Sequence, residues 1–280
     1  MNMKKLLLAT GTLLMMQLSQ AQSLTTPQPS PTQTIKQNFA LSSIEINYSR
    51  PGIKGRKVFG DLVPYGKVWR TGANSATTLT FGDTVTIGGT KIKPGKYGLL
   101  SIPDKNSWTM IITKQLDVTS PAAYKADQDV VRVEVKPMKM SDAVETFTMQ
   151  IANIKPNSCE LHLMWENTAV ALPISTDVES KVMADINQLM FKDNKPYFAA
   201  AAYYLENGKD LNQALAWFDK AIEQTPDAFW IHHQRANCLA KMGKKAEAKA
   251  AAQKSKDLAI AAKNDDYVRL NDKLMAELDK

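Results

Sequence analysis

A cationic and aromatic run between Tyr65 and Asn74 contains the residue types best suited to holding a ligand. Arg70 offers a guanidinium that forks onto a carboxylate, and Thr71 and Asn74 add a hydroxyl and an amide. Aromatic side chains in the run add flat apolar surface, which suits sugars and peptides. We therefore identify a candidate ligand site formed by Tyr65, Lys67, Trp69, Arg70, Thr71 and Asn74.

The same run has a structural interpretation, which the sequence leaves open. Arg70 would pair with a buried carboxylate such as Glu166, and Asn74 would satisfy the backbone of a turn. In that case the run stabilises the fold and binds no ligand.

The positive charge of the chain is concentrated around this candidate site. The formal net charge is +7, and residues 50–70 hold six Lys and Arg residues against one acid, Asp61. Residues 175–280 hold 16 basic and 16 acidic residues, so this part is neutral overall. A local cluster of cations favours an anionic or carboxylate-bearing partner. It is not a nucleic-acid footprint, because the rest of the β-rich region is balanced in charge and the chain is predicted to be exported.

A catalytic interpretation is the alternative. The protein would be a hydrolase or lyase acting on an envelope polymer, in which Arg70 stabilises developing negative charge and His162 or Asp61 acts as acid or base. This requires Arg70, Asn74, Asp61 and His162 to converge in one pocket. The sequence contains no nucleophile elbow, no phosphate loop and no zinc-protease motif, so we predict a non-catalytic protein.

Metal and redox chemistry find little support in the sequence. His232 and His233 are adjacent, whereas a helical metal pair needs a spacing of four residues. Cys159 and Cys238 fall in different predicted domains and lack thiolate-activating neighbours, so we expect two buried free thiols. We predict no metal and no cofactor.

The elements that carry the candidate site are short β-rich runs. Between Ser43 and Ser175 these runs are separated by turn signals, as in an antiparallel sandwich. Gly88-Gly89 permits the positive φ angles of a tight hairpin. The predicted strands are Ile44–Tyr48, Ala76–Phe81, Tyr97–Ile102, Trp108–Thr113, Val130–Val135, Thr146–Ile151, Glu160–Trp165 and Val170–Ile174.

Several motifs of this region are similar to those of one secreted bacterial family, DUF2911. They are Ser49–Arg56, Ile92–Tyr97, Trp108–Ile112 and, as the most specific, Tyr-Gly-Lys-Val-Trp-Arg-Thr-Gly-Ala-Asn at residues 65–74. The resemblance covers about residues 37–175 and implies a secreted β domain, but it implies no activity. Family members as a rule carry Glu after the last Asn, where this chain has Ser75, and an insertion common before the Asp-x-x-Arg strand is reduced here to Asp117–Asp127.

The pattern becomes helical after Ser175. Thr176 and Glu179 have the spacing of a capping box. A period of 34 residues relates Ala202 to Ala236, Leu205 to Leu239 and Ala214 to Ala248.

Over residues 195–262 these positions resemble two tetratricopeptide repeats, with flanking helices at 176–191 and 265–278 as caps. A generic helical bundle is the alternative. The resemblance implies a groove that holds an extended peptide, although Tyr203 and Trp230 would equally serve as packing residues. The implied groove residues are Tyr203, Trp230, His233 and Asn237.

The N-terminus predicts export. Lys4 and Lys5 precede an apolar core at Leu6–Leu18, and Ala21 is the small residue that a signal peptidase needs. We predict a signal peptide at 1–21, a mature chain from Gln22 and a flexible, proline-containing leader at 22–36. The mature protein is then periplasmic or secreted and has no membrane span.

The sequence thus predicts an all-β antiparallel sandwich at 37–175 and an all-α tetratricopeptide-like domain at 176–280. The predicted function is that of a non-catalytic binding protein of the envelope. We expect an anionic or carboxylate-bearing glycan or peptide on the β domain, and a peptide or protein on the helical repeats. Nucleic acid is not an expected partner.

Overall fold

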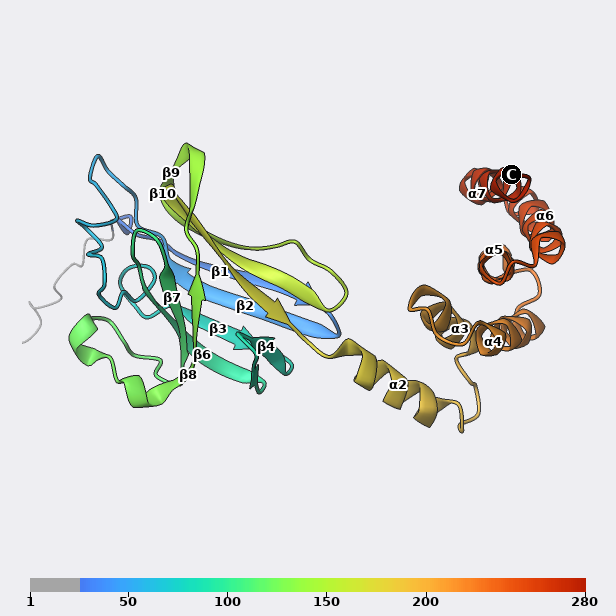
Figure 1. Cartoon of the computed structure of the whole chain (residues 1–280), viewed down its shortest axis with the longest axis horizontal. Coiled ribbons are helices and arrows are strands. Elements are labelled where there is room, and N and C mark those ends of the chain that lie inside the picture. Colours follow the sequence, from blue (N-terminus) through green and yellow to red (C-terminus); the bar gives the residue numbers. More distant parts are fainter. Residues whose placement is uncertain (1–25) are drawn as a thin grey trace, which may run out of the picture. The chain divides into compact units, whose positions relative to one another are not determined.

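The structure is a computed structural model that describes residues 26–280. These residues form two compact units, which divide after Val178 and are described separately (Figure 1). The predicted signal peptide at 1–21 and the start of the predicted leader, residues 22–25, lie outside the described residues.

The larger sheet of the first unit has six strands in the order β1-β2-β3-β6-β7-β8. All neighbouring strands are antiparallel, and most are consecutive in the chain, as predicted from the turn signals. The bounds are β1 Thr32–Phe39, β2 Ser42–Ser49, β3 Thr78–Phe81, β6 Gly95–Ile102, β7 Trp108–Thr113 and β8 Asp129–Val135. Two short 3-10 helices, Pro121–Ala123 and Ala126–Gln128, lie in the connection between β7 and β8.

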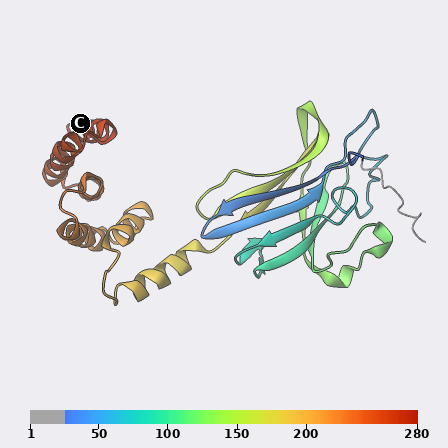
Figure 2. The same ribbon diagram turned by 180° about the vertical axis from the view of Figure 1, so that it is seen from behind.

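The smaller sheet has four strands in the order β5-β4-β10-β9 and covers the first sheet (Figures 1 and 2). Its strands are β4 Val85–Ile87, β5 Thr90–Ile92, β9 Met138–Ala152 and β10 Ser158–Ser175. Gly88 and Gly89 form the two-residue turn between β4 and β5, with φ angles of 55° and 79°, which confirms the predicted hairpin.

Strand β10 is bent. Its register against β9 shifts between Met164 and Thr168, and Glu166 in this stretch has a φ of 54°. The amide of Thr176, just after the strand, donates to the carbonyl of Asn157, just before it, over 2.9 Å. The two ends of β10 therefore lie together at one end of the sandwich. The sequence predicted two separate strands here, because the polar residues of the bend interrupt the apolar pattern.

The core of the sandwich lies between the sheets and takes residues from both. Alternation in β10 sends Cys159, Leu161, Leu163 and Trp165 inward, and each of them is at most 2% exposed. Burial of apolar surface at about 25 cal/mol per Å² is the main force that holds the two sheets together. The antiparallel sandwich predicted from the sequence is confirmed.

The predicted leader is wrong at its C-terminal end. Residues 32–36 belong to β1, which pairs with β2 in unbroken register from Thr32 to Phe39. Ile35 packs against the core and Phe39 is 4% exposed, so this strand has apolar side chains to bury. The last proline of the leader, Pro31, precedes the strand and accepts a hydrogen bond from the amide of Arg50.

The second unit consists of helices joined by short turns, and α3 to α7 follow one another along a curved row (Figure 1). The bounds are α2 Val178–Leu189, α3 Tyr197–Glu206, α4 Leu211–Gln224, α5 Phe229–Lys241, α6 Lys245–Ala261 and α7 Asp265–Leu278. Ala214, Ala236 and Ala248 of the predicted repeat are fully buried, where small side chains let helices approach closely. No helix in residues 26–280 is both long and apolar enough to cross a membrane.

The terminal helices cover the repeats unequally. In α7 the side chains of Leu274 and Leu278 pack on the cluster formed by α5 and α6. In α2 Ile186 is the single buried residue, and Leu189 at its end is 39% exposed. An ion pair between Glu179 and Lys209 joins α2 to the turn after α3. The predicted caps are thus present as helices, with α2 held by fewer contacts than α7.

Candidate functional site

Two adjoining hollows in the β unit share the side chains of Trp69 and Arg70. One has a volume of about 260 Å³ and the other of about 250 Å³. We call them together the Arg70 groove. Residues that line both hollows are Leu62, Val63, Trp69 and Arg70; one hollow adds Ser30, Pro51, Arg56, Gly72, Ala73 and Trp165, and the other adds Pro64, Lys67, Val68, Ser120 and Pro121.

The backbone around the groove is fixed by buried hydrogen bonds. Trp69 and Ser101 of β6 exchange amide-to-carbonyl bonds of 2.7 and 3.0 Å. Thr71 is fully buried, its hydroxyl lies 2.9 Å from that of Ser101, and its carbonyl accepts the hydroxyl of Thr77. Its φ of 56° is rare for a β-branched residue and costs about 1–3 kcal/mol. Thr71 is therefore a structural residue that turns the chain and positions its neighbours.

Gly72 makes this turn possible. Its φ is 151°, and a Cβ atom there would lie 3.0 Å from both the carbonyl oxygen of Ser49 and the hydroxyl of Thr77. A side chain would push the turn away from β2, so a glycine is required.

Trp69 forms the floor of the groove together with a cluster of aromatic rings. Its ring is stacked on that of Trp165, with centroids 5.8 Å apart and 17° between the planes. Phe59, Trp108 and Phe147 meet it edge to face at 5.1–6.4 Å. The indole N–H donates to the carbonyl of Gly72 over 3.0 Å, so its polar atom is satisfied within the protein.

Arg70 forms the wall of the groove, and its guanidinium group uses only part of its hydrogen-bonding capacity within the protein. One terminal nitrogen, Nη1, donates to the carbonyl of Thr119 over 2.7 Å. Nε–H is shielded from solvent and has no acceptor among the described residues. Arg56 and Lys67 line the same groove, and none of its described lining residues is acidic. The groove is therefore a cationic surface with an apolar floor, and one of its lining residues, Arg70, keeps a buried donor that meets no acceptor in the part of the chain that the structure describes.

The remaining cations of the basic segment serve other purposes. Arg50 donates to the carbonyl of Phe147 over 3.1 Å and to the hydroxyl of Thr148 over 2.8 Å, which joins the end of β2 to β9. Lys54 and Lys57 are exposed and do not line the groove. The charge cluster read from the sequence thus divides into groove residues, one structural arginine and solvated lysines.

Two residues of the predicted site lie apart from the groove. Tyr65 lines a separate hollow of about 50 Å³ together with Phe59 and Trp108. Asn74 is exposed, and its amide donates to the carbonyl of Ser30 over 3.0 Å, so it holds the segment before β1. Of the six predicted residues, the groove contains Lys67, Trp69 and Arg70.

The residues of the catalytic alternative do not converge. Neither Asp61 nor His162 lines the Arg70 groove. His162 lies on the outer face of β10, with Nε2 at 2.7 Å from Glu160. Glu166, the carboxylate that the structural interpretation gave as an example, lies at the bend of β10 and makes no ion pair with Arg70. The other part of that interpretation agrees with the structure, since Asn74 donates to a backbone carbonyl.

The four predicted groove residues of the helical unit differ in accessibility. Trp230 is 39% exposed, and Tyr203 and Asn237 are half-buried. His233 is 8% exposed, and its Nδ1 lies 2.8 Å from Oδ1 of Asn271 in α7. The structure therefore places His233 between helices, and leaves Trp230 as the most accessible side chain of the set.

Both cysteines are free and buried, as expected from their sequence context. Burial raises the pKa of the Cys159 thiol to about 11, with a smaller contribution from the charge of Glu160. Burial also raises the pKa of Cys238. Both thiols are therefore protonated at neutral pH, which makes them poor nucleophiles.

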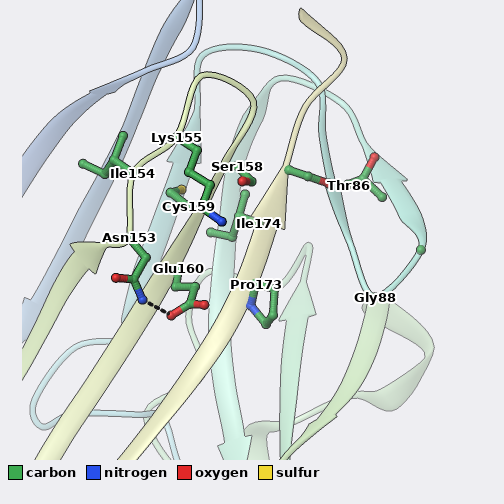
Figure 3. A pocket seen from close by; sticks show the side chains of 12 residues that line it. Thr86, Gly88, Asn153, Ile154, Lys155, Ser158, Cys159, Glu160, Pro173 and Ile174 are labelled. Carbon is green, nitrogen blue, oxygen red and sulfur yellow. Dashed lines mark hydrogen bonds between the residues drawn. The ribbon is translucent and has the colours of Figure 1, made fainter. Parts of the chain in front are cut away.

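A further hollow, which the sequence did not indicate, has a volume of about 640 Å³ and lies at the end of the sandwich where the two ends of β10 meet (Figure 3). It is lined by Thr86, Gly88, Gly89, Asn153, Ile154, Lys155, Ser158, Cys159, Glu160, Pro173, Ile174 and Ser175. We call it the Glu160 hollow. No motif marks it, because its residues come from three stretches of the chain, at 86–89, 153–160 and 173–175.

Comparison with known proteins agrees with the order of the two units. A family model described as "Protein of unknown function (DUF2911)" matches residues 30–174, and one described as "Tetratricopeptide repeat" matches residues 217–250. No curated protein and no solved structure matches the chain. The combination is consistent with a protein-interaction module. Because the first match covers more than half of the 280 residues, the chain belongs to the DUF2911 family.

Proposed function

We propose that the protein is an exported, non-catalytic binding protein whose β unit holds a carboxylate-bearing ligand in the Arg70 groove. The observation that carries this proposal is the Nε–H of Arg70, which is shielded from water and finds no acceptor in residues 26–280. An unpaired donor on a charged group is costly to bury, and a carboxylate that reached Nε–H through a small movement of the Arg70 side chain would remove that cost. Arg56 and Lys67 add positive charge on the approach, and Trp69 provides an apolar face for a sugar ring or peptide.

The hydrolase or lyase alternative is less well supported. General acid or base catalysis needs a titratable group within hydrogen-bond reach of the substrate. The described lining of the groove offers arginine, lysine and serine, but no carboxylate and no histidine. A site of this composition is suited to holding an anion, and it offers no carboxylate or imidazole to exchange a proton with it.

Replacing Arg70 tests the proposal. With trigalacturonate or N-acetyl-Ala-Ala as the probe, Arg70→Met should weaken binding about 10- to 100-fold, because a hydrogen bond to a charged group contributes roughly 1.5–3 kcal/mol. The affinity of Arg70→Lys should lie between those of the unsubstituted protein and Arg70→Met, since lysine keeps the charge but cannot donate two parallel hydrogen bonds. Titration calorimetry measures each dissociation constant.

A matched control separates the groove from general charge. Lys57→Met removes one charge from an exposed lysine of the same basic segment that does not line the groove, so it should leave affinity nearly unchanged. The methyl ester of trigalacturonate and N-acetyl-Ala-Ala amide should not bind. Equal losses in Arg70→Met and Lys57→Met, or equal binding of the uncharged probes, would contradict the proposal.

The helical unit supplies the second part of the proposed function, the docking of a protein partner of the envelope. Among the four predicted groove residues of the helical unit, Trp230 on α5 is the most accessible. Aromatic side chains are enriched where proteins bind one another. Export is proposed from the predicted signal peptide, with the mature chain beginning at Gln22.

Photo-crosslinking in the producing cell tests docking and export in one experiment. A benzophenone amino acid at position 230 should form an adduct with an envelope protein, whereas the same group at Lys254, an exposed position of α6, should not. Mass spectrometry of the adduct should find Gln22 as the first residue. Equal adducts at both positions would refute docking on this face, and a chain that keeps its first 21 residues would refute cleavage after Ala21.

A further inference from the structure

The Glu160 hollow presents a fixed carboxylate. Oε2 of Glu160 accepts the amide of Asn153 over 2.7 Å and lies 2.7 Å from Nε2 of His162, as Figure 3 shows for the first of these bonds. The hydrogen bond from His162, and then that from Asn153, hold the pKa of Glu160 below its usual value. Because both donors meet the same oxygen, Oε1 is left for another donor. Glu160 is therefore an ionised acceptor in a defined orientation.

Lys155 brings an opposite charge to the same hollow. Its side chain runs from the turn between β9 and β10 with the amino end toward the middle of the lining residues (Figure 3). Its positive charge contributes to the lowered pKa of Glu160, but the two side chains form no ion pair with each other. The ammonium group of Lys155 has no hydrogen bond or ion pair among the described residues. A cation and an anion thus lie near each other with a gap between them.

The remaining surface of the hollow is small, apolar or neutral. Its apolar surface comes from Ile154, which is 47% exposed, and from Pro173, while Cys159 and Ile174 lie beneath at 2% and 1% exposure. Ser158 and Thr86 provide hydroxyl groups at the edge, and Gly88 and Gly89 leave the backbone of the hairpin turn uncovered. The volume of about 640 Å³ lies within the range of small-molecule sites.

We propose that the Glu160 hollow binds a small zwitterion of the dipeptide class, with the ligand's ammonium group on Glu160 and its carboxylate on Lys155. Each charge of such a ligand meets an opposite charge of the protein, and an uncharged side chain can rest on the apolar surface between them. This site shares no residue with the Arg70 groove, so the proposal goes beyond the proposed function and does not depend on it.

Titration calorimetry with three dipeptide probes on the full mature chain carrying Arg70→Met tests this proposal, since that background weakens binding at the Arg70 groove about 10- to 100-fold. Ala-Ala should bind, whereas N-acetyl-Ala-Ala, which lacks the ammonium group, and Ala-Ala amide, which lacks the carboxylate, should bind at least tenfold more weakly. When either Glu160→Gln or Lys155→Met is added to the Arg70→Met protein, Ala-Ala binding should weaken at least tenfold. The nearly isosteric Glu160→Gln keeps the shape of the hollow and therefore tests the charge.

Controls keep the outcome decisive. Glu134→Gln and Lys139→Met remove the same charges from exposed positions that do not line the hollow, and they should leave Ala-Ala binding unchanged. Circular dichroism should show the same melting curve for all variants. Failure of Ala-Ala to bind at millimolar concentration, or equal binding of all three probes, would overturn the proposal. Failure of N-acetyl-Ala-Ala to bind the protein that keeps Arg70 would count against the Arg70 groove alone. The two proposals can therefore fail separately.

Discussion

Trp69→Ala is expected to destabilise the β unit by about 3 kcal/mol, the low end of the cost of truncating a core tryptophan. Trp69 contacts four aromatic rings, including the stacked ring of Trp165, and its indole N–H holds the carbonyl of Gly72. Removing it leaves a cavity among rings that cannot close together, and it frees the turn that carries Thr71. Native-state hydrogen exchange read by mass spectrometry gives the free energy of unfolding for each unit separately.

Trp230→Ala is the matched control for this prediction. It removes the same side chain from a position that is 39% exposed and that contacts the ring of the adjacent Phe229. We expect a cost below about 1 kcal/mol, as for surface substitutions in general. A loss below 1 kcal/mol in Trp69→Ala as well would show that the aromatic cluster does not support the groove.

Asn271→Ala is expected to destabilise the helical unit by about 2–4 kcal/mol through a buried polar network. Asn271 is fully buried; its Oδ1 lies 2.8 Å from His233, and its Nδ2 donates to the hydroxyl of Ser255 and the carbonyl of Tyr267. Ser255 in turn donates to the carbonyl of Phe229, so the network joins α5, α6 and α7. Alanine would leave the Nδ1–H of His233 without its acceptor, the hydroxyl oxygen of Ser255 without its donor, and a cavity beside them.

A double-mutant cycle with Ser255→Ala distinguishes the network from a simple cavity. Because the two residues share a hydrogen bond, their combined cost should differ from the sum of the single costs by at least about 0.5 kcal/mol. Asn237→Ala, at a half-buried asparagine of α5 bonded to Gln234, should cost below about 1 kcal/mol. Strict additivity, or equal losses at Asn237 and Asn271, would exclude the network as the source of stability.

The sequence predicted elements whose patterns are local. The run from Trp108 to Thr113 coincides with β7, and the hairpin at Gly88-Gly89 and the helices of the repeats form where turn residues and apolar spacing place them. Strand β1 was missed, because three prolines lie just before it and its pairing with β2 depends on contacts that a single sequence does not show. The sequence placed a break between Trp165 and Val170, but it did not show that one strand bends there, because the positive φ of Glu166 has no signal in a single sequence.

The candidate site was predictable to the extent that its residues are adjacent in the chain. Lys67, Trp69 and Arg70 come from one run, whereas Pro121 reaches the groove from the connection before β8. The role of Thr71 was not predictable, because its burial depends on Ser101 and Thr77. His233 has the spacing of a groove residue, but its partner Asn271 lies 38 positions away and holds it between helices.

The central claim, that the unpaired Nε–H of Arg70 receives a carboxylate, can be tested by observing that proton. In protein labelled with ¹⁵N-arginine, the Arg70 Nε–H resonance should shift and exchange more slowly with water when trigalacturonate is added. The Arg132 Nε–H, which already donates to Asp129 over 2.8 Å, should not change and serves as the internal reference. Saturable binding of trigalacturonate with an unchanged Arg70 Nε–H resonance would contradict the account.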